Sequence, residues 1–259
     1  MAAKSEEGGL VETLKTIVYA LLLAGLIRTL LFQPFYIPSG SMKPTLLVGD
    51  FLFVNKFAYG YSQHSCPFSM CPFEGRLFFS EPERGDIIVF RHPTNGTDYI
   101  KRLVGLPGAT VQMVDGRVIL NGTEVPQAPD GIFVEPTERG ARCSNAPVAP
   151  GGRCEKAQFT ETFPNGHAHA VIDTVPFASD NTPVLTVPEG QYFFMGDNRD
   201  NSLDSRAPRR LGGVGFVHAD YLIGRASRVM FSAAGSTLFA FWTWRSDRFF
   251  KGVNCRPGA

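Results

Sequence analysis

An apolar run dominates the N-terminal part of the chain. Residues 17–32 contain one charged side chain, Arg28, and Lys15 lies just before them. At about 1.5 Å per residue, a helix of this length is slightly shorter than a hydrocarbon core of about 30 Å. Because Lys15 and Arg28 can extend their charged ends toward the interfaces, we predict that residues 1–33 comprise a cytoplasmic tip and one transmembrane helix.

Two alternatives to an uncleaved anchor remain open. A cleaved signal peptide is disfavoured because no clear small-x-small cleavage motif follows the run. A buried helix of a soluble protein is the other alternative. Lys4 and Lys15 precede the run, and basic residues mark the cytoplasmic side of an anchor. The pattern therefore predicts a single-pass protein whose main body lies outside the cytoplasm.

After Pro34 the pattern changes to that of a β protein. Short β-branched or aromatic runs alternate with Gly, Pro, Asn and Asp, which is typical of strands and turns. Asp115-Gly116 and Asn121-Gly122 are hairpin-turn dipeptides. We therefore predict a mainly β fold with an antiparallel sheet as its core. The predicted strands lie in residues 51–55, 86–90, 99–104, 117–120, 184–187 and 191–195.

The segment 123–183 interrupts this pattern. It is rich in Pro, Gly, Thr and Ala and has few strong strand signals, so we predict an inserted β and loop-rich cap. The core would then be formed by residues 34–122 and 184–259. The aromatic and basic tail, residues 239–251, suits either a membrane–water interface or a terminal segment packed on the core.

Charge and cysteine content narrow the function classes. A net charge of +1 over 259 residues disfavours nucleic acid as a partner, since phosphate binding needs a concentrated basic surface. Cys66 with Cys71, and Cys143 with Cys154, could form two local disulfides in an oxidising compartment. Free buried thiols or a zinc site are the alternatives, and Cys255 would stay unpaired.

A rigid segment just after the anchor, residues 37–46, contains Ser39 and Ser41 between two prolines. Alone, it is typical of a structural turn. A serine hydroxyl becomes a nucleophile only when a neighbouring base takes its proton. None of the five histidines lies in a segment that appears built to orient it, although a histidine base stays possible.

Lys101 is an alternative base. It interrupts an otherwise apolar strand-like run, and Tyr99, Lys101 and Leu103 would share one face of the strand. Apolar neighbours reduce the hydration of a lysine, lower its pKa and so allow it to act as a neutral base. An ordinary surface lysine on an edge strand is the simpler interpretation of this segment alone.

A third segment, residues 195–206, is dense in short polar side chains. In a calcium loop that began at Asp197, Arg199 at the third position would break the alternation of ligands, and the glycine and the distal glutamate are missing. A hydrogen-bonded network that braces a site accounts for it better. No metal site is predicted.

Together and in this order, these segments resemble bacterial signal peptidase I, also called leader peptidase. The resemblance spans roughly residues 17–230 and omits much of 116–183. It implies a membrane-bound serine endopeptidase with a Ser/Lys dyad and an acyl-enzyme intermediate, acting without a cofactor. The segments that carry it are residues 38–46, 49–60, 84–90, 98–108, 196–206 and 224–226.

The resemblance implies a role for each matching residue. Ser41 resembles the nucleophile and Lys101 the general base, while the Ser39 hydroxyl and the Ser41 N–H resemble an oxyanion hole. Ser202 resembles a serine that orients the lysine. Asp204 and Arg206 resemble a supporting ion pair, with Asp197 nearby.

Substrate and location follow from the same resemblance. It implies cleavage of exported preproteins after an Ala-x-Ala pattern, at the bacterial inner membrane on its periplasmic or outer side, near the export machinery. The partners would be signal peptides and the lipid bilayer. The residues expected to line the apolar substrate pockets are Phe35, Ile37, Met42, Leu46, Tyr99 and Ile100. A β domain that binds extended peptides without cleaving them is the non-enzymatic alternative.

The chain departs from the family pattern in its longer link at residues 208–215 and in the stretch between Cys66 and Cys71. These differences leave the core chemistry unchanged but affect the expected loops and pockets.

Overall fold

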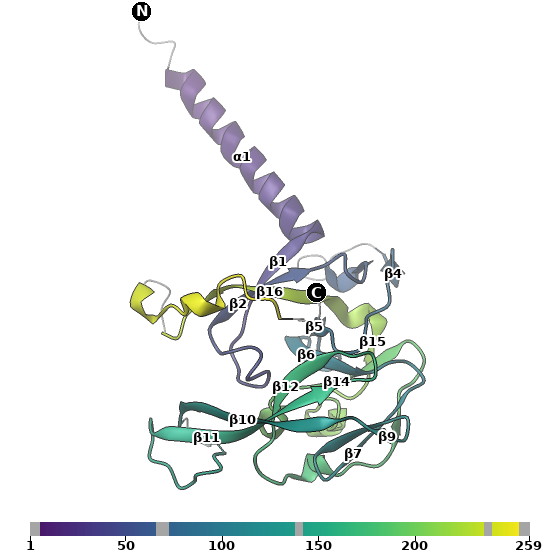
Figure 1. Cartoon of the computed structure of the whole chain (residues 1–259). Coiled ribbons are helices and arrows are strands. Elements are labelled where there is room, and N and C mark those ends of the chain that lie inside the picture. Colours follow the sequence, from purple (N-terminus) through teal and green to yellow (C-terminus); the bar gives the residue numbers. More distant parts are fainter. Residues whose placement is uncertain (1–5, 66–72, 138–141, 236–239, 254–259) are drawn as a thin grey trace, which may run out of the picture.

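The computed structural model describes residues 6–65, 73–137, 142–235 and 240–253. One long helix, α1 (Glu6–Leu30), points away from a body built of β-strands (Figure 1). Because the helix leads directly into the first strand, β1 (Phe32–Tyr36), the segment that carries Ser41 begins at the base of this helix.

The described residues of the body form sixteen strands and several single helical turns. After β1 the strands are β2 (Asp50–Asn55), β3 (Tyr61–Ser62), β4 (Arg76–Leu77), β5 (Ile87–Arg91), β6 (Asp98–Gly105), β7 (Thr110–Val114), β8 (Arg117–Leu120), β9 (Thr123–Glu124), β10 (Gln127–Pro136), β11 (Arg153–Thr162), β12 (Ala168–Ile172), β13 (Leu185–Thr186), β14 (Gln191–Met195), β15 (Val217–His218) and β16 (Leu222–Ser232). The 3₁₀ turns are η1 (Gln63–Ser65), η3 (Ala178–Asp180), η4 (Arg199–Asn201), η5 (Arg209–Leu211), η6 (Ala219–Tyr221), η7 (Phe241–Thr243) and η8 (Ser246–Arg248).

Among the described residues, the largest sheet has seven strands in the order β1-β2-β16-β5-β6-β14-β15. All its pairings are antiparallel. Strands β10, β11 and β12 form a separate sheet, and β13, β7, β8 and β9 form another. The mainly β, antiparallel fold predicted from the sequence is confirmed.

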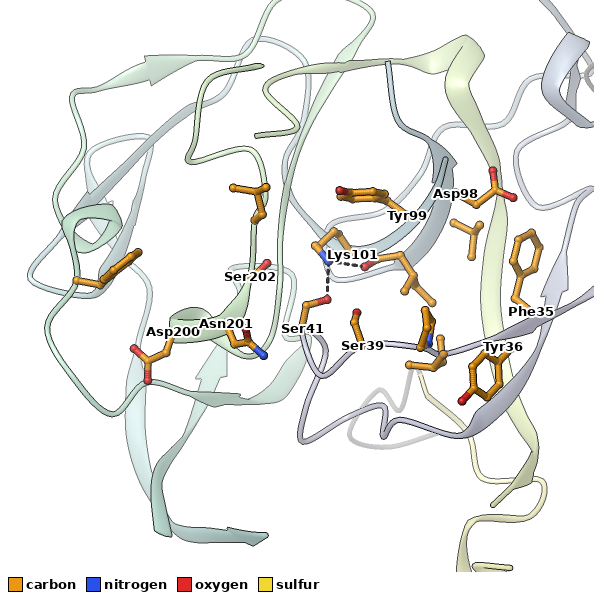
Figure 2. Close-up of a pocket in the computed structure, with 16 residues that line it drawn as sticks. Phe35, Tyr36, Ser39, Ser41, Asp98, Tyr99, Lys101, Asp200, Asn201 and Ser202 are labelled. Carbon is orange, nitrogen blue, oxygen red and sulfur yellow. Dashed lines mark hydrogen bonds between the residues drawn. The ribbon is translucent and has the colours of Figure 1, made fainter. Parts of the chain in front are cut away.

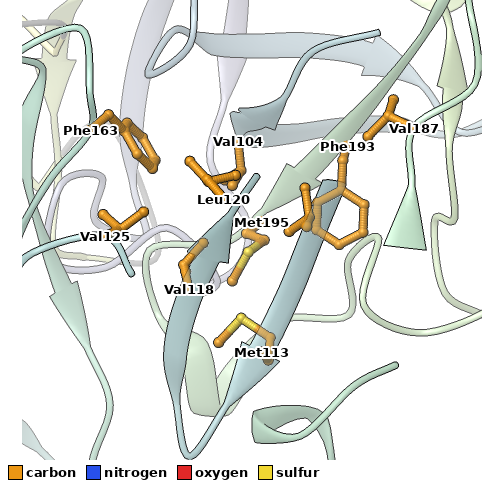
Figure 3. Packing of buried hydrophobic residues seen from close by; sticks show 10 residues of the cluster. Val104, Met113, Val118, Leu120, Val125, Phe163, Val187, Phe193 and Met195 are labelled. Carbon is orange, nitrogen blue, oxygen red and sulfur yellow. The ribbon is translucent and has the colours of Figure 1, made fainter. Parts of the chain in front are cut away.

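The hydrophobic core lies where these sheets meet. One cluster joins Val104 of β6 and Phe193 of β14 to Met113 and Val118 of the β7–β8 hairpin, with Phe163 beside them (Figure 3). All of these side chains are almost fully buried, and each buried aliphatic or aromatic side chain contributes about 1.5–3 kcal/mol by leaving water. The hairpin is thereby fixed against the strand that carries Lys101.

The predicted strands and turns are present with boundaries shifted by one or two residues. The 191–195 and 117–120 strands match β14 and β8 as predicted. Asp115-Gly116 and Asn121-Gly122 have positive φ values, as their hairpin turns require. The division at residues 123 and 183 stays a prediction.

Residues 123–183 contain two ten-residue strands, β10 and β11, that the weak local pattern did not locate. Pro129 and Gly131 lie at a register shift in β10, which explains the weak signal. Cys143 and Cys154 form the predicted disulfide. The other predicted pair, Cys66 and Cys71, and the odd Cys255 lie outside the described residues.

Within the described part of the chain, no helix is both long enough and apolar enough to cross a membrane. The prediction of a transmembrane helix is therefore not confirmed.

Candidate active site

Ser41 lies in a turn that is anchored in the hydrophobic core by the residues after it. Met42 and Leu46 are fully buried and pack with Leu52 and Ile87. The backbone N–H of Leu46 donates to the Met42 carbonyl at 2.9 Å. The Ser41 side chain points the other way, into a pocket. The core thus fixes the backbone of the serine while its hydroxyl stays accessible.

Lys101 lies on β6 and meets Ser41 across 60 positions of sequence. Its Nζ lies 2.6 Å from the Ser41 Oγ and 3.1 Å from the Ile100 carbonyl (Figure 2). The side chain is only 4% exposed. Burial lowers the pKa of Lys101 to about 8, although Asp204 and Asp197 act in the opposite direction. A lysine with this pKa is partly neutral near pH 8 and can accept a proton.

Behind the lysine, Asp204 and Arg206 form a buried ion pair. Arg206 Nε donates to Asp204 Oδ1 at 2.9 Å, and Arg206 Nη2 donates to Oδ2 at 3.0 Å. The N–H of Gly196 also donates to this carboxylate at 3.0 Å. Burial opposes the charge, but Arg206 and these hydrogen bonds hold the pKa of Asp204 below its ordinary value. The predicted ion pair is thus present, and Asp204 is an anion near Lys101 with several hydrogen-bond donors around it.

Ser202 lines the same pocket but does not make the contact expected of it. Its Oγ is buried, and among the described residues it forms no hydrogen bond to Lys101, whose Nζ contacts Ser41 and Ile100 instead. Ser202 Oγ lies close to Gly196, where an added Cβ would come within 2.3 Å of it. A side chain at position 196 would therefore disturb both Ser202 and the polar segment 195–206.

Asp197 forms an ion pair with Arg102, the residue after Lys101. Arg102 Nε and Nη2 donate to the two Asp197 oxygens at 2.7 and 2.6 Å, and the Thr45 hydroxyl donates to Oδ2 at 2.5 Å. Both members of the pair are almost fully buried. Because Arg102 follows Lys101 on β6, this pair links the strand of the lysine to the turn of the serine.

Two hydrogen-bond donors at the pocket, the Ser39 hydroxyl and the Ser41 N–H, have no protein acceptors among the described residues. The Ser39 side chain is exposed and lines the pocket beside Ser41. The backbone N–H of Ser41 is not used by the turn, whose bonds are formed by the N–H groups of Lys43 and Leu46. This arrangement can stabilise an oxygen anion that develops next to the Ser41 Oγ.

The pocket has a volume of about 530 Å³. Four of the six predicted substrate-binding residues line it, namely Phe35, Ile37, Tyr99 and Ile100. The structure does not bring Met42 and Leu46 into this pocket, because the turn sends both side chains into the core.

Several pocket residues were missed by sequence reasoning. They are Tyr36, Pro38, Val89, Asp98, Phe177, Asp200, Asn201 and Leu203. Tyr36, Pro38 and Asp98 adjoin predicted residues and could have been found by extending those segments. Phe177 belongs to the segment 123–183, which carried no functional signal.

The wall that contains Phe177 is held by the disulfide-bonded segment. The Arg142 guanidinium lies over the Phe177 ring at 4.1 Å from its centroid. Arg142 Nη1 also donates to the Asp200 carbonyl at 3.0 Å. Since the Cys143–Cys154 disulfide fixes the residue next to Arg142, this segment positions one side of the pocket.

None of the five histidines lines the pocket. His167 and His169 are buried beneath it, where His167 Nε2 lies 3.0 Å from Arg102 Nη1. Within the described residues, no cluster of His, Cys, Asp or Glu is placed to hold a metal ion. The chemistry that this pocket can perform is nucleophilic attack by a hydroxyl with a lysine as the base.

Comparisons with known proteins identify a family for this chain. A model of the family described as "Signal peptidase, peptidase S26" matches residues 10–231. Signal peptidase I of Rickettsia canadensis is 40% identical over 228 residues, which cover 84% of this chain and 78% of that protein. Signal peptidase I of Rickettsia massiliae is 39% identical over 225 residues, covering 83% and 77%.

A crystal structure of a signal peptidase I from Enterococcus faecalis is 29% identical and covers 57% of this chain and 98% of that one, with a TM-score of 0.31. A similarity of this size carries no weight for the arrangement of the site. The family match and the two relatives each cover most of the chain. The chain belongs to the signal peptidase family, peptidase S26.

Proposed function

We propose that this protein removes signal peptides from exported preproteins, with Ser41 as the nucleophile and Lys101 as the general base. The observation that carries the proposal is the distance of 2.6 Å between Lys101 Nζ and Ser41 Oγ. This distance allows direct proton transfer. The low exposure and lowered pKa of Lys101 supply the neutral amine that the transfer needs.

In the proposed reaction, Lys101 Nζ takes the proton of the Ser41 hydroxyl as Oγ attacks the scissile carbonyl carbon. The resulting oxyanion receives hydrogen bonds from the Ser41 N–H and the Ser39 hydroxyl. The Lys101 ammonium then gives its proton to the leaving amine, which leaves an acyl-enzyme on Ser41. Water, deprotonated by Lys101, hydrolyses the ester and regenerates the serine.

The pocket favours small side chains at the cleavage site. Phe35, Ile37, Tyr99 and Ile100 provide apolar walls, and large side chains would clash with such walls. We infer cleavage after an Ala-x-Ala pattern in an extended segment. Peptides with a Phe in place of the last Ala should be cleaved at least about 100-fold more slowly.

We further propose that the protein acts at a lipid bilayer, with its β body on the outer side of the bacterial inner membrane. The apolar side chains of α1 support this, since Leu21, Leu22 and Leu26 are all more than half exposed. The transfer of so many exposed apolar side chains from water into an apolar medium is favourable. The Cys143–Cys154 disulfide supports an oxidising compartment. A protein recovered with vesicles only while α1 is intact, and resistant to extraction by salt, would support attachment. Recovery in the aqueous fraction would contradict it.

The dyad is tested with Ser41→Ala and Lys101→Met, assayed on a preprotein and on an Ala-x-Ala peptide. Each variant should lose at least about 10³-fold in kcat/KM while it retains the wild-type circular dichroism spectrum. Lys251→Met changes an exposed lysine and serves as the matched control. Wild-type turnover in Lys101→Met would exclude the lysine mechanism. Loss of turnover on changing a histidine instead would favour a histidine base.

A further inference from the structure

Asn198 forms hydrogen bonds to Gly40 and Ser41, the two residues joined by the peptide bond that carries the Ser41 N–H. Its side-chain Nδ2 donates to the Gly40 carbonyl at 3.0 Å. Its backbone N–H donates to the Ser41 carbonyl at 3.1 Å. Asn198 is only 1% exposed. Two successive carbonyls of the turn are thus bound by one buried residue that lies 158 positions later in the chain.

The first of these bonds helps to fix the direction of the Ser41 N–H. In a planar trans peptide, the carbonyl of one residue and the N–H of the next point in opposite directions. The bond between Gly40 and Ser41 is not among the cis peptides. A donor that fixes the Gly40 carbonyl therefore fixes the Ser41 N–H, which has no acceptor among the described residues.

We propose that Asn198 is a positioning residue for the oxyanion hole: it locks the Gly40–Ser41 peptide so that the Ser41 N–H points at the substrate's developing oxyanion. This inference rests on the proposed function, because it assumes that Ser41 attacks a carbonyl. Asn198 does not touch the reacting atoms. It acts through the peptide bond that it holds.

The surroundings of Asn198 make it a rigid support. The preceding Asp197 is bound by Arg102, and its carbonyl accepts from the Ile172 N–H at 2.8 Å. The Asn198 carbonyl accepts from the Asn201 N–H at 3.1 Å, which begins the turn η4. The backbone on both sides of Asn198 is therefore fixed, so its side chain can transmit this rigidity to Gly40.

The unpaired oxygen of the Asn198 side chain distinguishes a catalytic role of this residue from a structural one. Asn198 Oδ1 is buried and has no hydrogen-bond partner among the described residues, which disfavours the folded state. The Gly40 carbonyl also accepts from the Lys43 N–H at 3.2 Å, so it stays paired without Asn198. Leucine, which has nearly the same shape, would remove the unpaired oxygen and the useful donor together.

This arrangement predicts opposite effects on stability and on rate. Asn198→Leu should be at least as resistant to urea as the wild type. Its kcat should fall about 10- to 100-fold, because a loosened peptide no longer presents its N–H at the required position. KM should stay within about two-fold, since the lost interaction is made mainly in the transition state.

The experiment measures kcat and KM for an Ala-x-Ala peptide between pH 7 and 10, together with urea unfolding. The variants are Asn198→Leu and Asn198→Asp, whose ionised carboxylate cannot donate to Gly40. The same substitutions at Asn95, an exposed turn residue, serve as controls. Both Asn198 variants should lose kcat, and in Asn198→Leu, which adds no charge near Lys101, the pH midpoint should stay at the wild-type value.

Wild-type kcat in both folded Asn198 variants would overturn the inference and leave the dyad intact. A loss of kcat that follows the unfolded fraction in both variants would also overturn it, since the role would then be structural. If the wild-type protein itself fails to cleave the peptide, the proposed function fails and this inference falls with it. The wild-type reference therefore distinguishes the two failures.

Discussion

The carboxylate of Glu135 on β10 binds the ammonium of Lys43, which lies two residues after Ser41. The other Glu135 oxygen lies 2.5 Å from Lys156 Nζ on β11. All three side chains are nearly buried, with 8–11% exposure. The pKa of Glu135 is lowered by the two lysines against the opposing effect of burial. One carboxylate therefore attaches the separate three-stranded sheet to the turn that contains Ser41.

We expect Glu135→Gln to destabilise the protein by up to about 3 kcal/mol, because it leaves two nearly buried cations without their anion. Urea unfolding at pH 7 measures this change. Glu155→Gln is the matched control, since Glu155 pairs with Arg153, which is 70% exposed, and exposed pairs contribute at most about 1 kcal/mol. Equal stability of the two variants would contradict a structural role of the Glu135 bridge.

The pH dependence of the reaction should report Lys101. Its pKa is lowered to about 8 in the folded protein from an ordinary 10.5. Only the neutral amine accepts the Ser41 proton, so kcat/KM should rise with pH and reach half of its maximum near pH 8. A rising limb centred near pH 10 would mean that burial does not lower the pKa.

The same pKa has a consequence for stability. Between about pH 8 and 10.5 the unfolded chain binds a proton at Lys101 that the folded protein does not, so this residue makes stability increase with pH in that window. Lys101→Met lacks the effect. The difference in unfolding free energy between variant and wild type should therefore favour the variant most below pH 8 and shrink as the pH rises.

Gly196→Ala should abolish most of the activity in a folded protein. The added Cβ would lie 2.5 Å from the Ser41 carbonyl and 2.3 Å from Ser202 Oγ, so the turn of the nucleophile would have to shift. A displacement of about 1 Å can cost about 100-fold in rate. Gly25→Ala, whose Cβ meets no atom within 4 Å, is the control. Wild-type kcat in Gly196→Ala would show that the turn can move without loss.

Loss of the disulfide should affect substrate binding more than chemistry. The double variant Cys143→Ser, Cys154→Ser frees the segment next to Arg142, which holds the Phe177 wall. We expect KM to rise several-fold with kcat nearly unchanged. A separation of 11 residues also predicts a stability loss of about 3 kcal/mol. Ser144→Ala is the neighbouring control, and an unchanged KM in the double variant would contradict the role of this wall.

The sequence was sufficient for the parts of the site that lie in continuous segments. Lys101 was selected because it interrupts an apolar strand-like run, Ser41 because it lies in a rigid segment between prolines, and the order of segments resembled one family. The strands β8 and β14 were found because their apolar residues are bounded by clear turn signals. These features depend on neighbours along the chain.

The missed features depend on contacts between distant segments. Met42 and Leu46 follow Ser41 closely and resemble pocket residues, but the direction of a turn decides whether they face the core. Phe177 lines the pocket and is held there by Arg142, and the sequence around neither residue indicates their contact. Ser202 lies in the predicted segment, but it does not bond Lys101, because that bond depends on a side-chain orientation that no spacing specifies.

The position of β16 between β2 and β5 determines when the enzyme can become active during its synthesis. These two neighbours are complete by residue 91, whereas β16 ends at residue 232. Ribosomes add residues from the N-terminus, so the gap in the middle of the sheet stays open until residue 232 has been made. The segment that braces Lys101 is made only shortly before. A growing chain therefore carries Ser41 from early on but cannot complete the sheet that supports the pocket until β16 has been made.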